Sequence, residues 1–216
     1  MEQQGFEELR KSVLDRMIQH NTCESSQNEV LHSNNDGILF SLLHKYWLEI
    51  LKQYRKPFIK WLETYYAAHK EVLNRIGVWF NESTDSGKVI VTQGILNFGG
   101  DAKVWAYKSS HVVLHEKAHC TAKENAYIEC FDNSSAMLLD ESVCHAYVRS
   151  KVNAGGESVV DAYDACTITA GERSTVIAHS WNQITAVGEA EVFAPSKYKI
   201  KILGQAKLTL KKPEEL

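Results

Sequence analysis

Hydrophobic and polar positions follow a period of eight from residue 104 to residue 207. Written in rows of eight, this stretch fills thirteen rows, and the first and third positions of every row are apolar. The first positions are Val104, Val112, Cys120, Ile128, Ala136, Cys144, Val152, Val160, Ile168, Val176, Ile184, Val192 and Ile200, and the third positions are Ala106, Leu114, Ala122, Cys130, Leu138, Ala146, Ala154, Ala162, Ala170, Ala178, Ala186, Ala194 and Ile202. With 44% hydrophobic residues in the chain, this match has a chance probability on the order of 10⁻⁹. A short fixed period predicts a stacked solenoid.

The other positions of each row predict how a repeat folds. Positions 1 and 3 point to one side of a β-strand and positions 2 and 4 to the other. Positions 5 and 6 are mostly turn formers, and position 7 is Ser, Ala or Cys in every row except at Asn182 and Tyr198. We therefore expect a strand at positions 1 to 4 and a corner at positions 5 to 8. Alanine at position 3 leaves little space between walls, which favours two walls and sixteen residues per coil over three walls and twenty-four.

The first part of the chain has a helical period instead. Apolar residues three and four apart over residues 6–17, 39–54 and 58–76 predict about three helices. The polar residues 21–37 predict a loop, and Asp36 is a candidate cap for the second helix. Pro57 predicts the first turn of a third helix or a kink, and Gly77 predicts its end.

Together these patterns predict an α+β fold. A small helical domain is expected over residues 1–87, with the loop of residues 81–87 as the boundary. A parallel β-solenoid is expected over residues 88–210, and a charged tail over residues 211–216.

The repeat, written V-x-A-x-x-x-S/A-x, resembles the octapeptide repeats of β-solenoid proteins of bacterial and phage origin. The resemblance covers about residues 96–207 and does not extend to the helical part. The resemblance implies a β-solenoid fold and a bacterial or phage genome, and it assigns no catalytic residue.

Charge, targeting signals and cysteines narrow the function classes. Residues 1–87 carry ten basic and twelve acidic residues, and residues 88–207 carry twelve and thirteen, so neither part has the basic excess of an electrostatically driven nucleic-acid binder. The N-terminal sequence lacks a basic and an apolar region, so no secretory signal is expected, and no stretch is apolar enough to span a membrane. Four of the five cysteines occupy positions 1, 3, 1 and 7 of the repeat, where other rows have Val, Ala or Ser. We expect a cytoplasmic protein with reduced thiols in its core.

One sequence motif that usually indicates a zinc site is not expected to form one here. His115, Glu116 and His119 match HExxH, in which a zinc site needs both histidines on one face of a helix. Here the motif runs from a strand through a corner, so the two side chains do not converge. The evenly spaced His111, His115 and His119 are likewise expected to be corner residues. Neither metal nor cofactor is expected, and no residues support an enzyme.

Two candidate binding surfaces remain. In a sixteen-residue coil, position 4 of alternate rows stacks His115, Phe131, Tyr147, Tyr163 and His179 at about 4.8 Å. Such a ladder stabilises the solenoid, and it can also bind a protein, a sugar or unpaired bases.

The second surface lies between Lys45 and Lys60, where basic residues alternate with aromatic ones. The aromatic residues fall mostly on the apolar stripe and are expected in the core, but the pattern also fits RNA binding.

The sequence thus predicts a non-enzymatic binding protein whose partner is a protein. A phage-type inhibitor of a bacterial defence complex, which is anti-CRISPR-like and can contact a host ribonucleoprotein, is the leading hypothesis, by genomic analogy. The alternatives are a structural protein that self-associates through the solenoid and an RNA-binding module that uses the segment from Lys45 to Lys60. The predicted contact residues are Lys52, Arg55, Lys56 and Lys60 in the helical part, with Phe131, Tyr147 and Tyr163 secondary.

Overall fold

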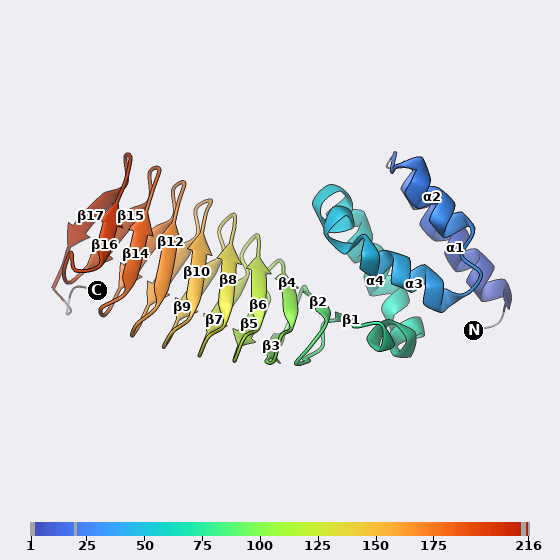
Figure 1. Ribbon diagram of the computed structural model, residues 1–216, viewed down its shortest axis with the longest axis horizontal. Helices are drawn as coiled ribbons and strands as arrows, with labels where there is room; N and C mark the ends of the chain where they lie inside the picture. The colour runs from blue at the N-terminus through green and yellow to red at the C-terminus, as the bar shows by residue number, and fades with distance from the viewer. Residues whose placement is uncertain (1–2, 20, 213–214, 216) are drawn as a thin grey trace. The chain divides into compact units, whose positions relative to one another are not determined.

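A computed structural model describes the whole chain except residues 1–2, 20, 213–214 and 216 (Figure 1). The chain divides into two compact units, Met1–Phe80 and Asn81–Leu216. The predicted boundary loop, residues 81–87, directly follows this division.

The first unit is helical. Its described residues form α1 (Gln3–Gln19), α2 (Glu24–Leu31), α3 (Asp36–Lys45) and α4 (Trp47–Arg75), followed by the short strand β1 (Val78–Phe80). Its core contains fully buried side chains from α3 and α4, among them Leu39, Trp47, Leu62 and Leu73. This burial explains the helical period of the sequence.

The loop predicted over residues 21–37 is wrong, because α2 lies within it. This helix has only eight residues, and only Ser26 and Val30 are buried. Two turns with one buried apolar residue are too short to show a 3.6-residue period. Short helices of this kind depend on tertiary packing more than on their own sequence.

The first of the two alternatives at Pro57, the start of a third helix, is wrong, because Pro57 lies inside α4, which has 29 residues in all. The chain breaks instead at Tyr46, which has non-helical dihedral angles (φ −96°, ψ 16°). A proline inside a helix costs about 3 kcal/mol. Burial of Phe58, Trp61 and Leu62 just after it offsets that cost.

The helix ends are set by local hydrogen bonds. The side chain of Asn35, not Asp36, caps α3 by accepting a hydrogen bond from the backbone N–H of Ile38 (2.9 Å). The predicted end at Gly77 is confirmed, since its φ is +77° and its N–H donates to the carbonyl of Asn74.

The second unit is a parallel β-solenoid. Its strands are β2 (Lys88–Val91), β3 (Ile95–Phe98), β4 (Lys103–Ala106), β5 (His111–Leu114), β6 (His119–Ala122), β7 (Tyr127–Cys130), β8 (Ser135–Leu138), β9 (Val143–Ala146), β10 (Lys151–Ala154), β11 (Val159–Ala162), β12 (Thr167–Ala170), β13 (Thr175–Ala178), β14 (Gln183–Ala186), β15 (Glu191–Ala194), β16 (Ile200–Ile202) and β17 (Lys207–Leu210). They stack in chain order from green to red in Figure 1. Even-numbered strands form one sheet and odd-numbered strands from β3 form the other, here called the even wall and the odd wall.

The predicted coil of two walls and sixteen residues is confirmed. Lys151 pairs with Thr167 in the next coil of the even wall, and Val159 pairs with Thr175 in the odd wall. The odd wall contains eight strands, so the solenoid makes about eight turns. Positions 1 and 3 are buried in every row except the last, where Ile200 and Ile202 are half-buried.

The strands begin one residue earlier than predicted. They span positions 8 to 3 of the repeat, as in His111–Leu114, so position 4 already belongs to the corner. In a typical corner the carbonyl of position 4 accepts a hydrogen bond from the N–H of position 7, as between His115 and Ala118 (3.1 Å). Position 5 lies in the left-handed region, for example Glu116 at φ +57° and Asp132 at φ +59°. The strand limits are shifted because the carbonyl of position 4 already accepts the hydrogen bond that closes the turn.

The acidic residues at position 5 have a structural role. The Glu116 carboxylate accepts a hydrogen bond from the N–H of Gly100 (2.7 Å), and the Asp132 carboxylate accepts one from the N–H of Glu116 (3.2 Å). The same bond joins Asp140 to the N–H of Glu124 (3.1 Å). Each carboxylate thus satisfies a corner N–H sixteen residues earlier, which links neighbouring coils.

Candidate binding surfaces

The predicted aromatic column lies on the odd wall, where each ring follows a strand. His115 stacks on Phe131 with centroids 5.3 Å apart, and Phe131 stacks on Tyr147 at 4.7 Å. Tyr147 stacks on Tyr163 at 5.0 Å, and Tyr163 stacks on His179 at 4.4 Å. The planes of successive rings differ by only 5° to 12°. The predicted stack of position 4 side chains is therefore confirmed.

This geometry restricts what the column can bind. The inner rings, Phe131, Tyr147 and Tyr163, each have neighbours against both faces. A base or a sugar ring needs a free aromatic face for stacking. The column therefore offers only ring edges and tyrosine hydroxyl groups to a partner. Protein side chains can contact such groups, whereas a nucleic-acid base could not stack on them.

A hydrogen-bonded network runs beside the column on the same wall. The Tyr127 hydroxyl lies 2.8 Å from Nδ1 of His145, and Nε2 of His145 lies 3.4 Å from a carboxylate oxygen of Asp161. Nε2 of His179 lies 3.2 Å from the other oxygen of Asp161. A carboxylate only accepts, so a proton on Nε2 of His145 would face Asp161, and in that neutral tautomer Nδ1 would accept a hydrogen bond from the Tyr127 hydroxyl.

The same wall holds a second acid–histidine pair, in which Nε2 of His111 lies 2.7 Å from a Glu129 oxygen. Burial, followed by the negative charge of Glu129, raises the pKa of Tyr127 to about 12. Burial is also the main cause that raises the pKa of Tyr147 and Tyr163. These phenols remain neutral hydrogen-bond donors at physiological pH.

The predicted basic segment of the helical unit is only partly described. The side chains of Lys52 and Arg55 lie outside the described part of the chain, whereas Lys56 and Lys60 are exposed on α4. Because α4 is continuous, the backbone positions of Lys52, Lys56 and Lys60 stand four residues apart along one line of the helix.

Lys45 lies outside this line, at the end of α3. Its Nζ donates to Glu29 at 2.8 Å, and the Tyr46 hydroxyl donates to the same carboxylate at 2.8 Å. The hydrogen bond from Lys45 is the main cause that lowers the pKa of Glu29, and its partner Glu29 likewise raises the pKa of Lys45.

The large aromatic residues of this segment belong to the core, as expected. Trp47, Phe58 and Trp61 are buried, and the Trp47 and Phe58 rings meet edge to face at 5.5 Å. Their ring faces are therefore not available to nucleic-acid bases.

The histidines of the HExxH match lie on different walls. His115 stacks on Phe131 of the odd wall. His119 begins β6 on the even wall, where its Nδ1 lies 2.9 Å from the Ser135 hydroxyl. Burial, followed by the charge of Lys103, lowers the pKa of His119. Among the described residues, histidine, cysteine and acidic side chains form no group of three that could hold a metal ion.

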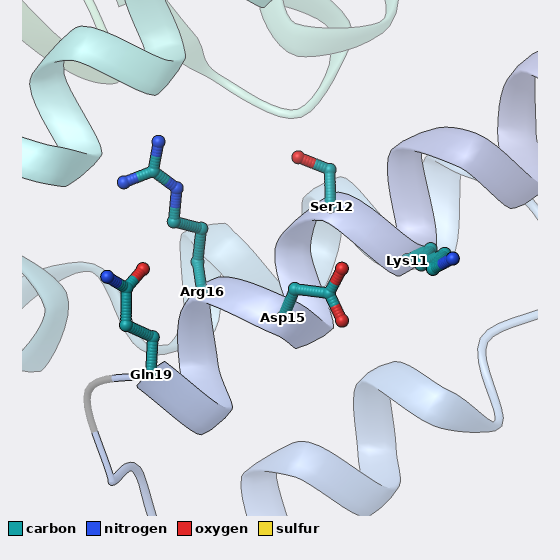
Figure 2. A pocket seen from close by; sticks show the side chains of 5 residues that line it. All are labelled: Lys11, Ser12, Asp15, Arg16 and Gln19. Carbon is teal, nitrogen blue, oxygen red and sulfur yellow. The ribbon is translucent and has the colours of Figure 1, made fainter.

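A shallow hollow on α1 does not form an enclosed binding site. It is lined by Lys11, Ser12, Asp15, Arg16 and Gln19, which all belong to this one helix. Figure 2 shows these side chains fanning out along the helix rather than converging on a point. A small ligand would find no enclosing second element among these residues.

No family model, no curated protein and no solved structure matches this chain. In the described part of the chain, no helix combines the length and the apolar character that crossing a membrane requires.

Sequence reasoning missed the network beside the column, although the sequence contains a signal for it. His111 and Glu129 are eighteen residues apart, as are Tyr127 and His145. This spacing places position 8 of one coil diagonally next to position 2 of the following coil.

Proposed function

We propose that the protein is a non-enzymatic binding protein that acts in the cytoplasm through contact with another protein. The more specific proposal is an inhibitor of a bacterial defence complex, of the anti-CRISPR kind. The resemblance of the repeat to octapeptide repeats of bacterial and phage-encoded proteins motivates this choice of partner. A self-associating structural protein and an RNA-binding module remain the alternatives.

The observation that carries the proposal is the regular solenoid surface. Positions 1 and 3 fill its interior with side chains such as Ala162 and Val160, both fully buried. Two parallel sheets therefore present their outward side chains to solvent in a sixteen-residue register. Extended surfaces of this type serve as binding platforms in repeat proteins.

We place the specific contacts on α4 and treat the aromatic column as secondary. The column repeats every sixteen residues, so a partner shifted by one coil would meet similar groups. Lys56 and Lys60 are exposed on an irregular surface, where a shifted partner would lose its contacts. Lysine and arginine on such a surface can bind acidic groups of a partner protein.

The proposal is tested by charge reversal in bacteria that carry an active defence system. Expression of the chain should restore plaque formation by a targeted phage, and a tagged chain should co-purify one component of the defence complex. Replacement of Lys52, Arg55, Lys56 and Lys60 by Glu should abolish both effects. A control with Lys11, Arg16, Lys70 and Arg75 replaced by Glu changes the net charge equally and should retain both.

Three outcomes would contradict this proposal. No protection in any tested defence system would exclude the inhibitor. Loss of binding in Tyr147→Ser with Tyr163→Ser, but not after charge reversal, would place the contact on the solenoid. Co-purified material that nuclease releases from the tagged chain would favour the RNA-binding module.

A further inference from the structure

Two corners of the solenoid that lie one coil apart depart from the repeat. They follow β13 and β15, and they contain Asn182 and Tyr198 at position 7, where the other rows have Ser, Ala or Cys. Position 5 is left-handed in the neighbouring corners, at Asp164, Glu172 and Gly188, but not at Ser180 or Ser196. These corners are thus built differently from those before them.

The first of these corners is held firmly despite its irregular sequence. The Asn182 side chain accepts a hydrogen bond from the N–H of Cys166 (3.0 Å) and donates one to the carbonyl of Ala162 (3.0 Å). The Ser180 hydroxyl donates to the carbonyl of Asp164 (2.6 Å). These bonds fix the corner from which Trp181 projects.

The two corners expose aromatic rings that differ from the column. Trp181 is 73% exposed and Tyr198 is 60% exposed. Their centroids lie 6.3 Å apart with the planes at 68°, so the rings meet edge to face instead of covering each other. An edge-to-face contact covers only one face of one ring, so ring-face area stays open to a planar ligand here, unlike in the inner rings of the column.

The chain segment that contains Tyr198 carries an excess of positive charge. Residues 192–212 contain six lysines and no acidic residue, whereas residues 88–191 contain eight basic and thirteen acidic residues. Lys197 and Lys199 flank Tyr198, and Nζ of Lys199 lies 5.4 Å from its ring centroid. Lys197, Lys199 and Lys201 are exposed, and within the described part of the chain none of them pairs with a carboxylate.

We propose that this corner patch, which comprises Trp181, Lys197, Tyr198, Lys199 and Lys201, binds single-stranded nucleic acid. Bases stack on Trp181 and Tyr198, and the lysines contact the phosphate groups. Stacking on exposed aromatic side chains combined with cationic contacts is how proteins bind single strands without sequence preference. A protein partner fits less well, because a standard interface buries about 800 Å² per partner around an apolar centre. This inference does not rest on the proposed function.

The probe for the test is a fluorescein-labelled single-stranded 12-mer of uridine, titrated with the full chain and followed by fluorescence anisotropy. Trp181→Ala and Tyr198→Ala should each weaken binding at least about fivefold, since stacking contributes roughly 1–3 kcal/mol per base, or about 5- to 160-fold. A charge-reversal triple, Lys197→Glu with Lys199→Glu and Lys201→Glu, should weaken it more than tenfold. All of these side chains are exposed, so the melting temperature should remain near that of the parent.

The matched control is a second charge-reversal triple, Lys108→Glu with Lys117→Glu and Lys151→Glu. These lysines are exposed on the solenoid outside the patch, and the net charge changes equally. Binding by the control should stay within threefold of the parent. For single strands, the logarithm of the binding constant falls with the logarithm of the salt concentration, with a slope of about −0.7 per neutralised phosphate. If three phosphates are neutralised, the parent should bind roughly 20-fold more weakly at 200 mM than at 50 mM salt.

Several results would overturn the inference. Absence of binding at 50 mM salt, or equal losses in the two triples, would exclude a specific site in the corner patch. If polyglutamate competes as well as the oligonucleotide while Trp181→Ala has no effect, the patch binds an acidic polypeptide instead. Loss of binding only after Lys56→Glu with Lys60→Glu would move the nucleic-acid site to α4.

Discussion

A charge placed in the solenoid interior tests the assigned register most directly. Ala170 is fully buried at position 3, and in the even wall it pairs with Ala154 on one side and Ala186 on the other. Thr169, the preceding residue of the same strand, points outward and is exposed. Ala170→Asp and Thr169→Asp therefore introduce the same carboxylate one residue apart, on opposite sides of the sheet.

The two substitutions should differ greatly in their effect on stability. A buried carboxylate without a partner costs about 3–5 kcal/mol, which lowers the melting temperature by roughly 10 °C. Thr169→Asp should change the free energy of unfolding by less than about 1 kcal/mol, because its charge stays in water. Thermal unfolding followed by circular dichroism measures both changes.

The pH dependence separates the effect of charge from that of volume. Burial disfavours ionisation, so the carboxyl group introduced by Ala170→Asp has a higher pKa in the folded than in the unfolded chain. Its destabilising effect should therefore be smaller at pH 4 than at pH 7. Equal melting temperatures for Ala170→Asp and the parent at pH 7 would refute the register of positions 1 and 3.

Two further predictions concern titratable groups. The pKa of Tyr127 is raised to about 12, so the unfolded chain, in which a phenol titrates near 10, loses its proton first. The stability that Tyr127 contributes through its neutral form is thus lost between about pH 10 and pH 12. Tyr127→Phe should make unfolding less sensitive to pH in this range, and an unchanged dependence would contradict the shift. Of the five cysteines only Cys23 is exposed, so Ellman's reagent should titrate one thiol in the folded protein and five in denaturant. Rapid native reaction of a second thiol would show that the solenoid core opens.

The sequence was most informative where local and long-range constraints coincide. Every coil buries the same two positions, so the eight-residue period, together with alanine at position 3, predicted the two walls, the sixteen-residue register and the stacking of Tyr147 on Tyr163. The strand limits were shifted by one residue because the corner hydrogen bond begins at position 4, which the apolar pattern cannot reveal.

Prediction failed where an irregular tertiary core decides the local structure. The helix through Pro57 persists because the side chains after it are buried, and α2 forms with only two buried residues. The exceptions at Asn182 and Tyr198 were visible in the sequence, but their consequence was not. Only the structure showed that the rings of Trp181 and Tyr198 are exposed and adjacent.

The relation between a repeat of eight and a coil of sixteen limits how this solenoid can change in length. Removal of sixteen residues deletes one coil, shortens the stack by about 4.8 Å, and leaves every later side chain on its original wall. Removal of eight residues also keeps positions 1 and 3 inside, so the interior would accept it. It would, however, transfer every later strand to the opposite wall, so that the column from His115 to His179 would be divided between two faces. The arrangement of the outward side chains is therefore kept only when the length changes by sixteen residues, whereas the interior also accepts a change of eight.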